Sequence, residues 1–288
     1  MKKNNKYLSV IAIVFALTLL IGGAYVFNES NNKIDGDIDP VIKVINEDNT
    51  TKEEENNDDE EKRYETITFP SLDNLEITAD FYKIDDSSPI ILLFHRAQWS
   101  RGEYREIAPR LCDLGYNVLA IDARSGGAIN GVTNITAQKA AEAGLGGEYA
   151  DAGVDIEATI NYSINELGYD DIITWGSSYS TVLVIAISEK YNENVMGIIT
   201  FSPGGYFGYE EKNVMEHAQN LSIPIYLTGG KTEDIVANAI LENVASEIKI
   251  KFKPEANGVH GSMNLWESVD AHKEHWESLE SFLNLIKK

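Results

Sequence analysis

Ser178 lies in a segment whose pattern predicts a nucleophilic serine. The apolar, β-type run over residues 172–175 ends at Gly176, and an apolar helical pattern begins a few residues later. A strand, a very tight turn and a helix form a nucleophile elbow, which holds its serine at positive φ and exposes the hydroxyl. The common pattern is G-x-S-x-G, and here Gly176 and the small residue Ser180 flank the serine. The N–H of Tyr179, at the start of the helix, is expected to face the oxyanion of an acyl-transfer intermediate.

A serine hydroxyl needs a base within hydrogen-bond reach and a third group that orients the base. Of the five histidines, His260 lies in a glycine-containing loop after the last predicted strand, where its ring can reach into a cleft. The other four are not favoured: His95 comes too early in the chain for the usual order, and the remaining three are assigned to surface or packing positions. His95 ends an early strand, whereas His217, His272 and His275 lie in helical patterns, and the pair at 272 and 275 has no obvious third ligand for a metal ion.

The orienting carboxylate is expected after the strand predicted over residues 223–228. Glu233 and Asp234 both follow that strand, and either could accept the imidazole N–H and stabilise the imidazolium. We favour Asp234, which could also cap the next helix. The chain order Ser178, Asp234, His260 is the order found in one particular fold.

The elements that position these residues alternate between strand and helix. An antiparallel pair is expected at residues 66–69 and 75–82, followed by buried strands at 89–94, 117–121, 172–175, 195–201, 223–228 and 248–252. Helices are expected over 100–114, 149–167, 182–187, 210–221, 234–244 and 266–286, and a loop with a short helix over 124–148. Ser100 and Glu103 are predicted to form a capping box. The alternation predicts a mainly parallel sheet covered on both faces, with the site at the carboxyl ends of the strands.

Four parts of the sequence together resemble the α/β-hydrolase superfamily, and within it the dienelactone-hydrolase-like and small prolyl-oligopeptidase-like serine hydrolases. They are Leu92–Tyr104, Ile121–Arg124, Trp175–Ser180, and Gly229–Val236 with Gly258–Ser262. The resemblance implies an α/β-hydrolase fold, with a mostly parallel eight-stranded sheet and helices on both faces. It also implies that the second N–H of the oxyanion hole comes from the loop after the third strand, at Ala97.

The first 62 residues predict a targeting segment and a spacer. Lysines precede an apolar run that ends at Phe27 and is long enough to span a bilayer as a helix. Residues 1–27 are therefore either a retained anchor or a signal peptide cut after Ala24, and both alternatives export the rest of the chain. Residues 28–62 are acidic and poor in aromatic residues, which predicts a disordered linker. Residues 63–288 are assigned to the α/β-hydrolase domain.

Composition excludes several classes of function. The net charge of −22 repels phosphate backbones, so nucleic-acid binding is not expected. A single cysteine, Cys112, excludes an internal disulfide and a cysteine-based zinc site. The predicted chemistry requires neither a metal ion nor an organic cofactor. The oligomeric state is left open.

The leading prediction is a carboxylesterase-like serine hydrolase that acts on a small-molecule ester or acyl substrate through an acyl-enzyme. Ser178 attacks, His260 transfers the proton, Asp234 orients His260, and the N–H groups of Ala97 and Tyr179 bind the oxyanion. A peptidase or an acyltransferase of the same fold are alternatives. Because Ser180 replaces the usual glycine, a non-catalytic surface binding module is the alternative from a different class.

Overall fold

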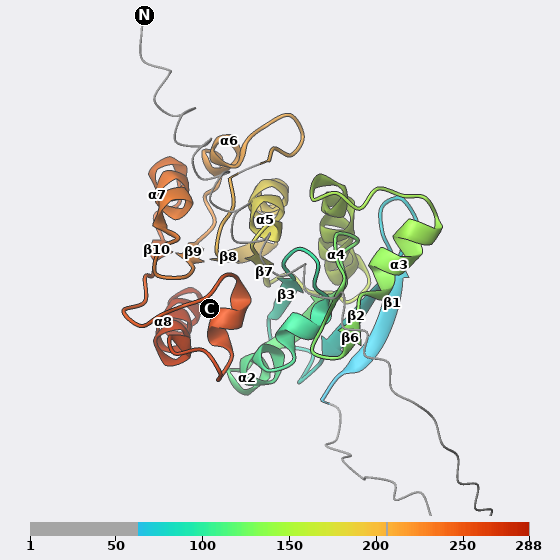
Figure 1. The fold of residues 1–288 in the computed structure, drawn as a ribbon, viewed down its shortest axis with the longest axis horizontal. Helices are drawn as coiled ribbons and strands as arrows, with labels where there is room; N and C mark the ends of the chain where they lie inside the picture. The colour runs from blue at the N-terminus through green and yellow to red at the C-terminus, as the bar shows by residue number, and fades with distance from the viewer. Residues whose placement is uncertain (1–62, 206, 288) are drawn as a thin grey trace, which may run out of the picture. The chain divides into compact units, whose positions relative to one another are not determined.

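An eight-stranded sheet runs through the described part of the chain, which is residues 63–205 and 207–287 of the computed structural model (Figure 1). In sheet order the strands are β1 Glu65–Pro70, β2 Glu76–Tyr82, β4 Asn117–Ile121, β3 Ile90–Phe94, β7 Ile172–Ser177, β8 Val195–Phe201, β9 Ile225–Thr228 and β10 Lys249–Lys251. β2 pairs antiparallel with β1 and β4, and every other neighbouring pair is parallel. The mostly parallel sheet expected from the sequence is therefore confirmed, with the antiparallel pair at one edge.

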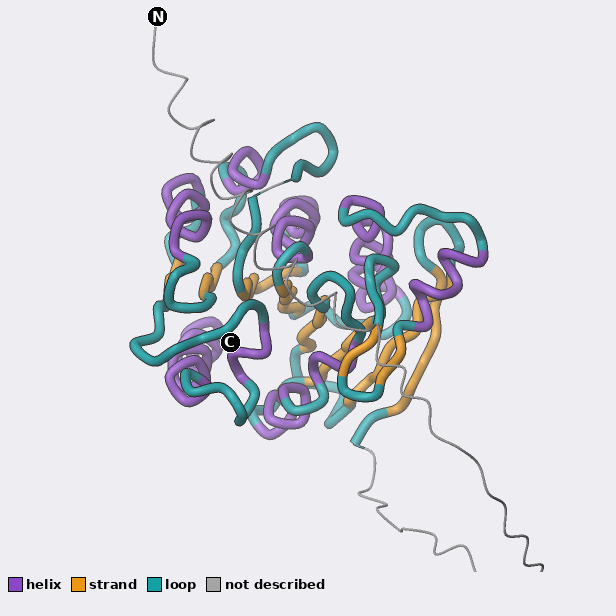
Figure 2. The backbone as a smooth tube through the Cα atoms, in the orientation of Figure 1, coloured by secondary structure: helices purple, strands orange, loops and turns teal. Residues whose placement is uncertain are grey.

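Helices cover both faces of this sheet (Figure 1 and Figure 2). On one face lie α4 Gly153–Asn165, α5 Ser180–Ser188, α6 Val214–Ala218 and α7 Asp234–Asn243, and on the other lie α2 Ile107–Asp113 and α8 His272–Ile286. α3 Ile135–Glu142 packs against β2 and follows a short hairpin of β5 Ala128–Ile129 and β6 Val132–Thr133. Four 3-10 turns complete the described elements: η1 Arg101–Tyr104, η2 Ala150–Ala152, η3 Glu189–Tyr191 and η4 Ser262–Leu265.

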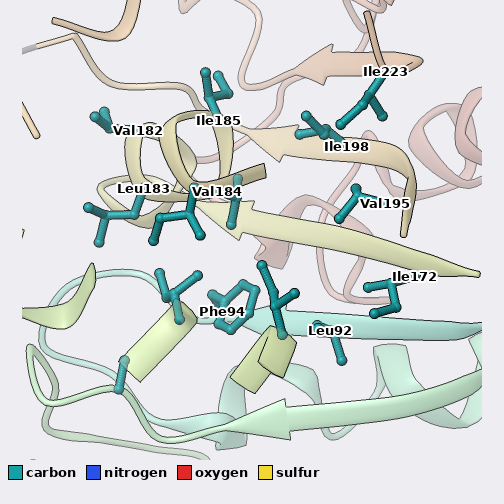
Figure 3. Packing of buried hydrophobic residues seen from close by; sticks show 14 of the residues in the cluster. Leu92, Phe94, Ile172, Val182, Leu183, Val184, Ile185, Val195, Ile198 and Ile223 are labelled. Carbon is teal, nitrogen blue, oxygen red and sulfur yellow. The ribbon is translucent and has the colours of Figure 1, made fainter. Parts of the chain in front are cut away.

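The helix α5 is buried along its whole length at the centre of the fold. Its side chains from Val182 to Ile185 lie over the central strands, near Phe94 and Leu92 of β3 and Ile198 of β8 (Figure 3). Every residue of β3 and β4 is also buried, as expected of parallel strands covered on both faces. Since each fully buried aliphatic side chain contributes about 1.5–3 kcal/mol, this cluster fixes the junction between β7 and α5.

The strands of the eight-stranded sheet lie where the sequence pattern predicts them, but the hairpin of β5 and β6 was not predicted and three helices differ. The helix expected over 100–114 is divided into η1 and α2, and the helix expected over 266–286 begins only at His272. The helix expected over 210–221 is shortened to α6. Glu210 and Glu211 adopt positive φ, which is incompatible with a right-handed helix, and Asn213 then caps α6 through a capping box with Glu216.

The predicted anchor or signal peptide at residues 1–27 and the predicted linker at 28–62 lie outside the described residues, so the domain boundaries stay predictions. Among the helices within residues 63–205 and 207–287, none combines the length and the apolar character needed to cross a membrane.

Candidate active site

Ser178 occupies a strained turn between β7 and α5. Its φ is 60°, and the residue is 7% exposed. A non-glycine residue at such a φ costs on the order of 1–3 kcal/mol and persists only where the surroundings hold it. A β-carbon on Gly176 would lie 2.7 Å from the backbone N and Cα of Thr181, so strand and helix approach too closely there for a side chain. The backbone therefore has the form of the elbow predicted from the sequence.

Ser180, which stands where the common pattern has glycine, is accommodated by its own hydrogen bonds. Its hydroxyl accepts a hydrogen bond from the Ser177 N–H at 2.8 Å and donates to the carbonyl of Phe94 at 2.8 Å. Because the side chain is fully buried, both bonds are needed to satisfy the hydroxyl. The departure from glycine thus ties the elbow to the end of β3 and does not disrupt the turn.

Replacing Gly176 with alanine should lower the free energy of unfolding by about 1–3 kcal/mol, because the added methyl would overlap the Thr181 backbone. Urea denaturation measures this change. Gly147→Ala is the matched control, since a β-carbon there would come no closer than 3.7 Å to any atom outside its chain neighbours. Equal stability of the two variants would show that the close approach at the elbow is absent in solution.

His260 joins the serine to a carboxylate. Its Nε2 lies 2.7 Å from the Ser178 hydroxyl oxygen, and its Nδ1 lies 2.5 Å from Oε1 of Glu233. Glu233 Oε2 accepts hydrogen bonds from the N–H of Gly230 at 2.8 Å and from the hydroxyl of Ser202 at 2.5 Å. These partners assign the proton of the neutral imidazole to Nδ1, which leaves Nε2 free to accept the serine proton. The arrangement is that of a nucleophile, a base and an orienting acid.

The surroundings of Glu233 keep its carboxylate ionised. Burial on its own favours the protonated carboxyl, but the hydrogen bonds from His260, Ser202 and Gly230 and the charge of the imidazolium outweigh it. The pKa of Glu233 is therefore lowered below its ordinary value. An acid with a lowered pKa remains negative at neutral pH and can stabilise the imidazolium that forms when His260 takes a proton.

Asp234 does not contact His260, so the sequence-based preference for this residue as the orienting acid is wrong. Its carboxylate instead forms ion pairs with Lys251, the last residue of β10, at 3.5 Å and with Lys253, two residues later. Asp234 is the first residue of α7 and points outward, whereas Glu233 precedes the helix. From that position the longer glutamate side chain turns back to the ends of the strands.

Sequence reasoning missed two residues that hold the histidine loop. Ser202, itself at a φ of 56°, accepts a hydrogen bond from the Gly261 N–H at 2.7 Å while it donates to Glu233. Arg96 donates from Nη1 to the carbonyl of His260 at 3.0 Å. Ser202 directly follows β8 and Arg96 follows β3 by two residues. A polar residue just beyond the carboxyl end of a parallel strand is the signal that could have identified both.

A cavity of about 400 Å³ adjoins the two residues expected to bind the oxyanion. Ala97 lines it directly, and so does Tyr149, whose ring stacks on the ring of Tyr179 with centroids 5.0 Å apart. The rest of its lining comes from Gln98 and from the 124–148 segment, which includes the alanines of α3 at 137, 140 and 141. Ser178 and His260 do not line this cavity, so it neighbours the elbow and does not enclose it.

Arg124, which also lines this cavity, is not available to a ligand as a free cation. Its guanidinium donates to both carboxylate oxygens of Asp73 and to both of Asp155, at distances of 2.7–3.0 Å. The side chain is only 3% exposed. Apart from this paired guanidinium, the residues that line the cavity are neutral.

Two aromatic residues that follow Ala97 closely in the sequence, Trp99 and Tyr104, are used for packing. Tyr104 is fully buried and donates its hydroxyl hydrogen to the carbonyl of Phe94 at 2.8 Å. Trp99 stacks on Trp266 with ring centroids 5.6 Å apart, and the guanidinium of Arg96 lies 4.5 Å from its ring centroid. Neither residue lines the cavity.

His95, His217 and His275 have structural partners away from Ser178. His95 is fully buried, with Nε2 accepting from the N–H of Ala123 at 3.0 Å, and burial lowers its pKa. His217 is held by Glu189 at 2.7 Å, and His275 is buried beside Thr228. Within residues 63–205 and 207–287, no three His, Cys, Asp or Glu side chains gather closely enough to hold a metal ion.

Comparison with known proteins finds one family model that matches part of the sequence. Residues 85–208, under half of the chain, match the family model described as serine aminopeptidase, S33. No curated protein sequence matches the chain.

Several solved structures have a similar fold. The dienelactone hydrolase of Anabaena variabilis is 12% identical, with a TM-score of 0.60 over 77% of this chain and 98% of that one. A highly thermostable carboxyl esterase of Bacillus coagulans is 13% identical, with a TM-score of 0.59 over 78% of this chain and 99% of that one. The esterase Pf2001 of Pyrococcus furiosus is 17% identical, with a TM-score of 0.55 over 77% of this chain and 90% of that one. At these identities the likeness shows the fold. This likeness, together with the strand order and the elbow, shows that the chain has the α/β-hydrolase fold.

Proposed function

We propose that the protein is a serine hydrolase of the carboxylesterase kind, which cleaves carboxyl ester or related acyl bonds through an acyl-enzyme. The observation that carries the proposal is the continuous set of hydrogen bonds from Ser178 through His260 to Glu233, at a serine held at positive φ. A serine with an adjacent base, and a base with an orienting acid, is the arrangement that activates a hydroxyl as a nucleophile.

The proposed reaction has two halves. In the first, the Ser178 oxygen attacks the ester carbonyl while its proton passes to Nε2 of His260. The N–H groups of Tyr179 and Ala97 stabilise the resulting oxyanion, and His260 returns the proton to the departing alcohol. In the second half, water attacks the acyl-enzyme, giving its proton to His260 and releasing the carboxylic acid as Ser178 regains its hydrogen. Glu233 remains ionised throughout and holds the imidazole in place.

A peptidase is the second candidate, because the matching family model is described as a serine aminopeptidase. An aminopeptidase must bind the free ammonium group of its substrate, for which a carboxylate is the usual partner. The residues lining the cavity beside Ala97 include neither Asp nor Glu, and its one cation, Arg124, is already paired. This lining favours a neutral ester over a peptide with a charged amino terminus.

A serine-reactive fluorophosphonate and a panel of substrates test the proposal together. We expect the probe to label the peptide that contains Ser178, and p-nitrophenyl esters of graded chain length to be cleaved faster than an aminoacyl amide. Denatured protein serves as the control for nonspecific labelling. A folded protein that neither reacts with the probe nor cleaves any ester would favour the non-catalytic binding module. Labelling with cleavage of the amide alone would favour the peptidase.

We also propose that residues 1–27 direct export, as a membrane anchor or as a cleaved signal peptide, and that residues 28–62 act as a spacer. The proposal is supported by the lysines and the apolar run of the sequence. The mass of the mature chain recovered from membrane and soluble fractions distinguishes the two alternatives, and a full-length chain confined to the cytoplasm would contradict both.

A further inference from the structure

We infer that Glu103 is a positioning residue, whose buried carboxylate joins the three segments that carry the proposed catalytic groups. The inference rests on the proposed function. Glu103 does not contact the substrate-facing atoms of the site. It lies behind them, in η1, and is 0% exposed.

Each oxygen of the Glu103 carboxylate binds a different part of the site. Oε2 accepts a hydrogen bond from the backbone N–H of Arg96 at 2.8 Å, on the loop that carries Ala97. Oε1 accepts from the hydroxyl of Ser177 at 2.7 Å, directly before Ser178. Oε1 also accepts from the backbone N–H of Ser262 at 3.1 Å, two residues after His260. One side chain therefore fixes the oxyanion loop, the elbow and the histidine loop relative to one another.

The contacts around these three bonds reinforce the same junction. The N–H of Ser262 also lies 3.0 Å from the hydroxyl oxygen of Ser177, so the elbow and the histidine loop are bridged directly as well. The indole N–H of Trp266 donates to the carbonyl of Glu103 at 2.9 Å, which fixes the backbone from which the carboxylate projects. A β-carbon on Gly261 would lie 2.8 Å from the Ser177 hydroxyl oxygen, so the histidine loop comes as close to the elbow as a glycine allows.

The local role expected for Glu103 does not account for its position. In a capping box its side chain would turn back to the N–H of Ser100, but the carboxylate points to the site instead. Burying a carboxylate is costly unless its oxygens are well hydrogen-bonded. An apolar side chain would fill the same space without this cost. Only a carboxylate, in which both oxygens accept hydrogen bonds, can bind the donors from all three segments.

The charge state of Glu103 makes the inference testable by pH. Burial raises the pKa of the carboxyl to about 7, although its hydrogen bonds and the cation of Arg96 act in the opposite direction. The charged and titratable groups that act on it from the packed segments are Arg96 and Tyr104 of the same turn. Burial raises the pKa of Tyr104 far above its ordinary value, so this residue stays neutral. The ionised carboxylate accepts all three hydrogen bonds, and protonation, which occurs as the pH falls through about 7, replaces an acceptor with a donor.

Glu103→Gln imitates the protonated side chain at every pH, because the amide places a donor against either the Arg96 N–H or the Ser177 and Ser262 pair. We expect this variant to lower kcat for ester hydrolysis by roughly 10- to 100-fold at pH 8, with KM changed less than about 3-fold, since small displacements of catalytic groups have effects of this size. The acid limb of kcat/KM should also change. In the wild type, loss of the Glu103 proton contributes to this limb. The variant has no carboxyl at this position, so its limb should lack that contribution and be less steep than that of the wild type.

Two further variants complete the experiment. Glu106→Gln, an exposed position three residues on, is the matched control and should retain wild-type kinetics and pH profile. Ser177→Ala removes only one of the three hydrogen bonds, and it should lower kcat several-fold even if Glu103→Gln fails to fold. Thermal unfolding measures the folded fraction of each variant, so kcat is expressed per folded molecule.

The outcomes separate this inference from the proposed function. A wild-type protein without esterase activity defeats both. If the wild type is active, then a Glu103→Gln variant with kcat within two-fold of wild type and an unchanged acid limb overturns the positioning role alone. If Glu103→Gln does not fold, unchanged kcat in Ser177→Ala has the same consequence. A merely structural role would lower the unfolding temperature and leave the acid limb as it is in the wild type.

Discussion

Ser178→Ala should lower kcat for ester hydrolysis by about 10⁶-fold, while KM stays within a few-fold of the wild type. The variant removes the only atom that can form the proposed acyl-enzyme. The residual rate would come from binding and from the N–H groups of Tyr179 and Ala97, which do not depend on the serine oxygen. Because alanine and serine adopt positive φ at similar cost, the fold should persist, and thermal unfolding checks that it does.

Ser188→Ala is the matched control for this prediction. Ser188 is also a buried serine of the same strand–helix unit, at the far end of α5, and its hydroxyl pairs with Thr174 at 2.9 Å. We expect this variant to keep wild-type kcat and fluorophosphonate labelling, whereas Ser178→Ala loses both. Esterase activity that persists in Ser178→Ala at more than a thousandth of the wild-type rate, in protein free of contaminating hydrolases, would show that another residue is the nucleophile.

The elbow could be predicted from the sequence because all of its determinants are local. A strand, a close approach that requires Gly176, a strained Ser178 and an apolar helix occupy one short continuous stretch. His260 was identifiable for a related reason, since it lies in a loop after a strand, next to a glycine. The parallel sheet follows from the alternation of apolar strands with helical patterns, and it brings the ends of β7 and β9 to the same edge.

Two features of the site could not be predicted from the sequence. The first is which of two neighbouring carboxylates points to His260. Whether Glu233 or Asp234 reaches His260 depends on the residue at which α7 begins, and the boundaries of helices are the least certain part of a sequence-based prediction. Glu103 was misread for a different reason. The Ser100-x-x-Glu103 spacing fits a local capping box, but donors from Ser177 and Ser262, far away in the sequence, compete successfully for the carboxylate.

Glu233→Gln is expected to lower kcat by about 10⁴-fold, the size of effect seen when the orienting acid of such a triad becomes an amide. The amide nitrogen would face either the imidazole Nδ1 or the N–H of Gly230 and the hydroxyl of Ser202. In the first case it favours the tautomer with the proton on Nε2, which cannot accept the serine proton. In the second it leaves donors facing donors. Both cases also remove the negative charge that stabilises the imidazolium.

Asp234→Asn is the control for Glu233→Gln, because the two variants make the same chemical change at adjacent positions. Asp234, at the start of α7 and near the protein surface, forms its ion pairs with Lys251 and Lys253. Exposed pairs of this kind contribute about 0–1 kcal/mol, so the variant should be slightly less stable and keep kcat within two- to three-fold of the wild type. Steady-state kinetics of the two variants at pH 8 decide between the acids. A larger loss of kcat in Asp234→Asn than in Glu233→Gln would mean that the loop before α7 rearranges in solution and presents the aspartate to His260.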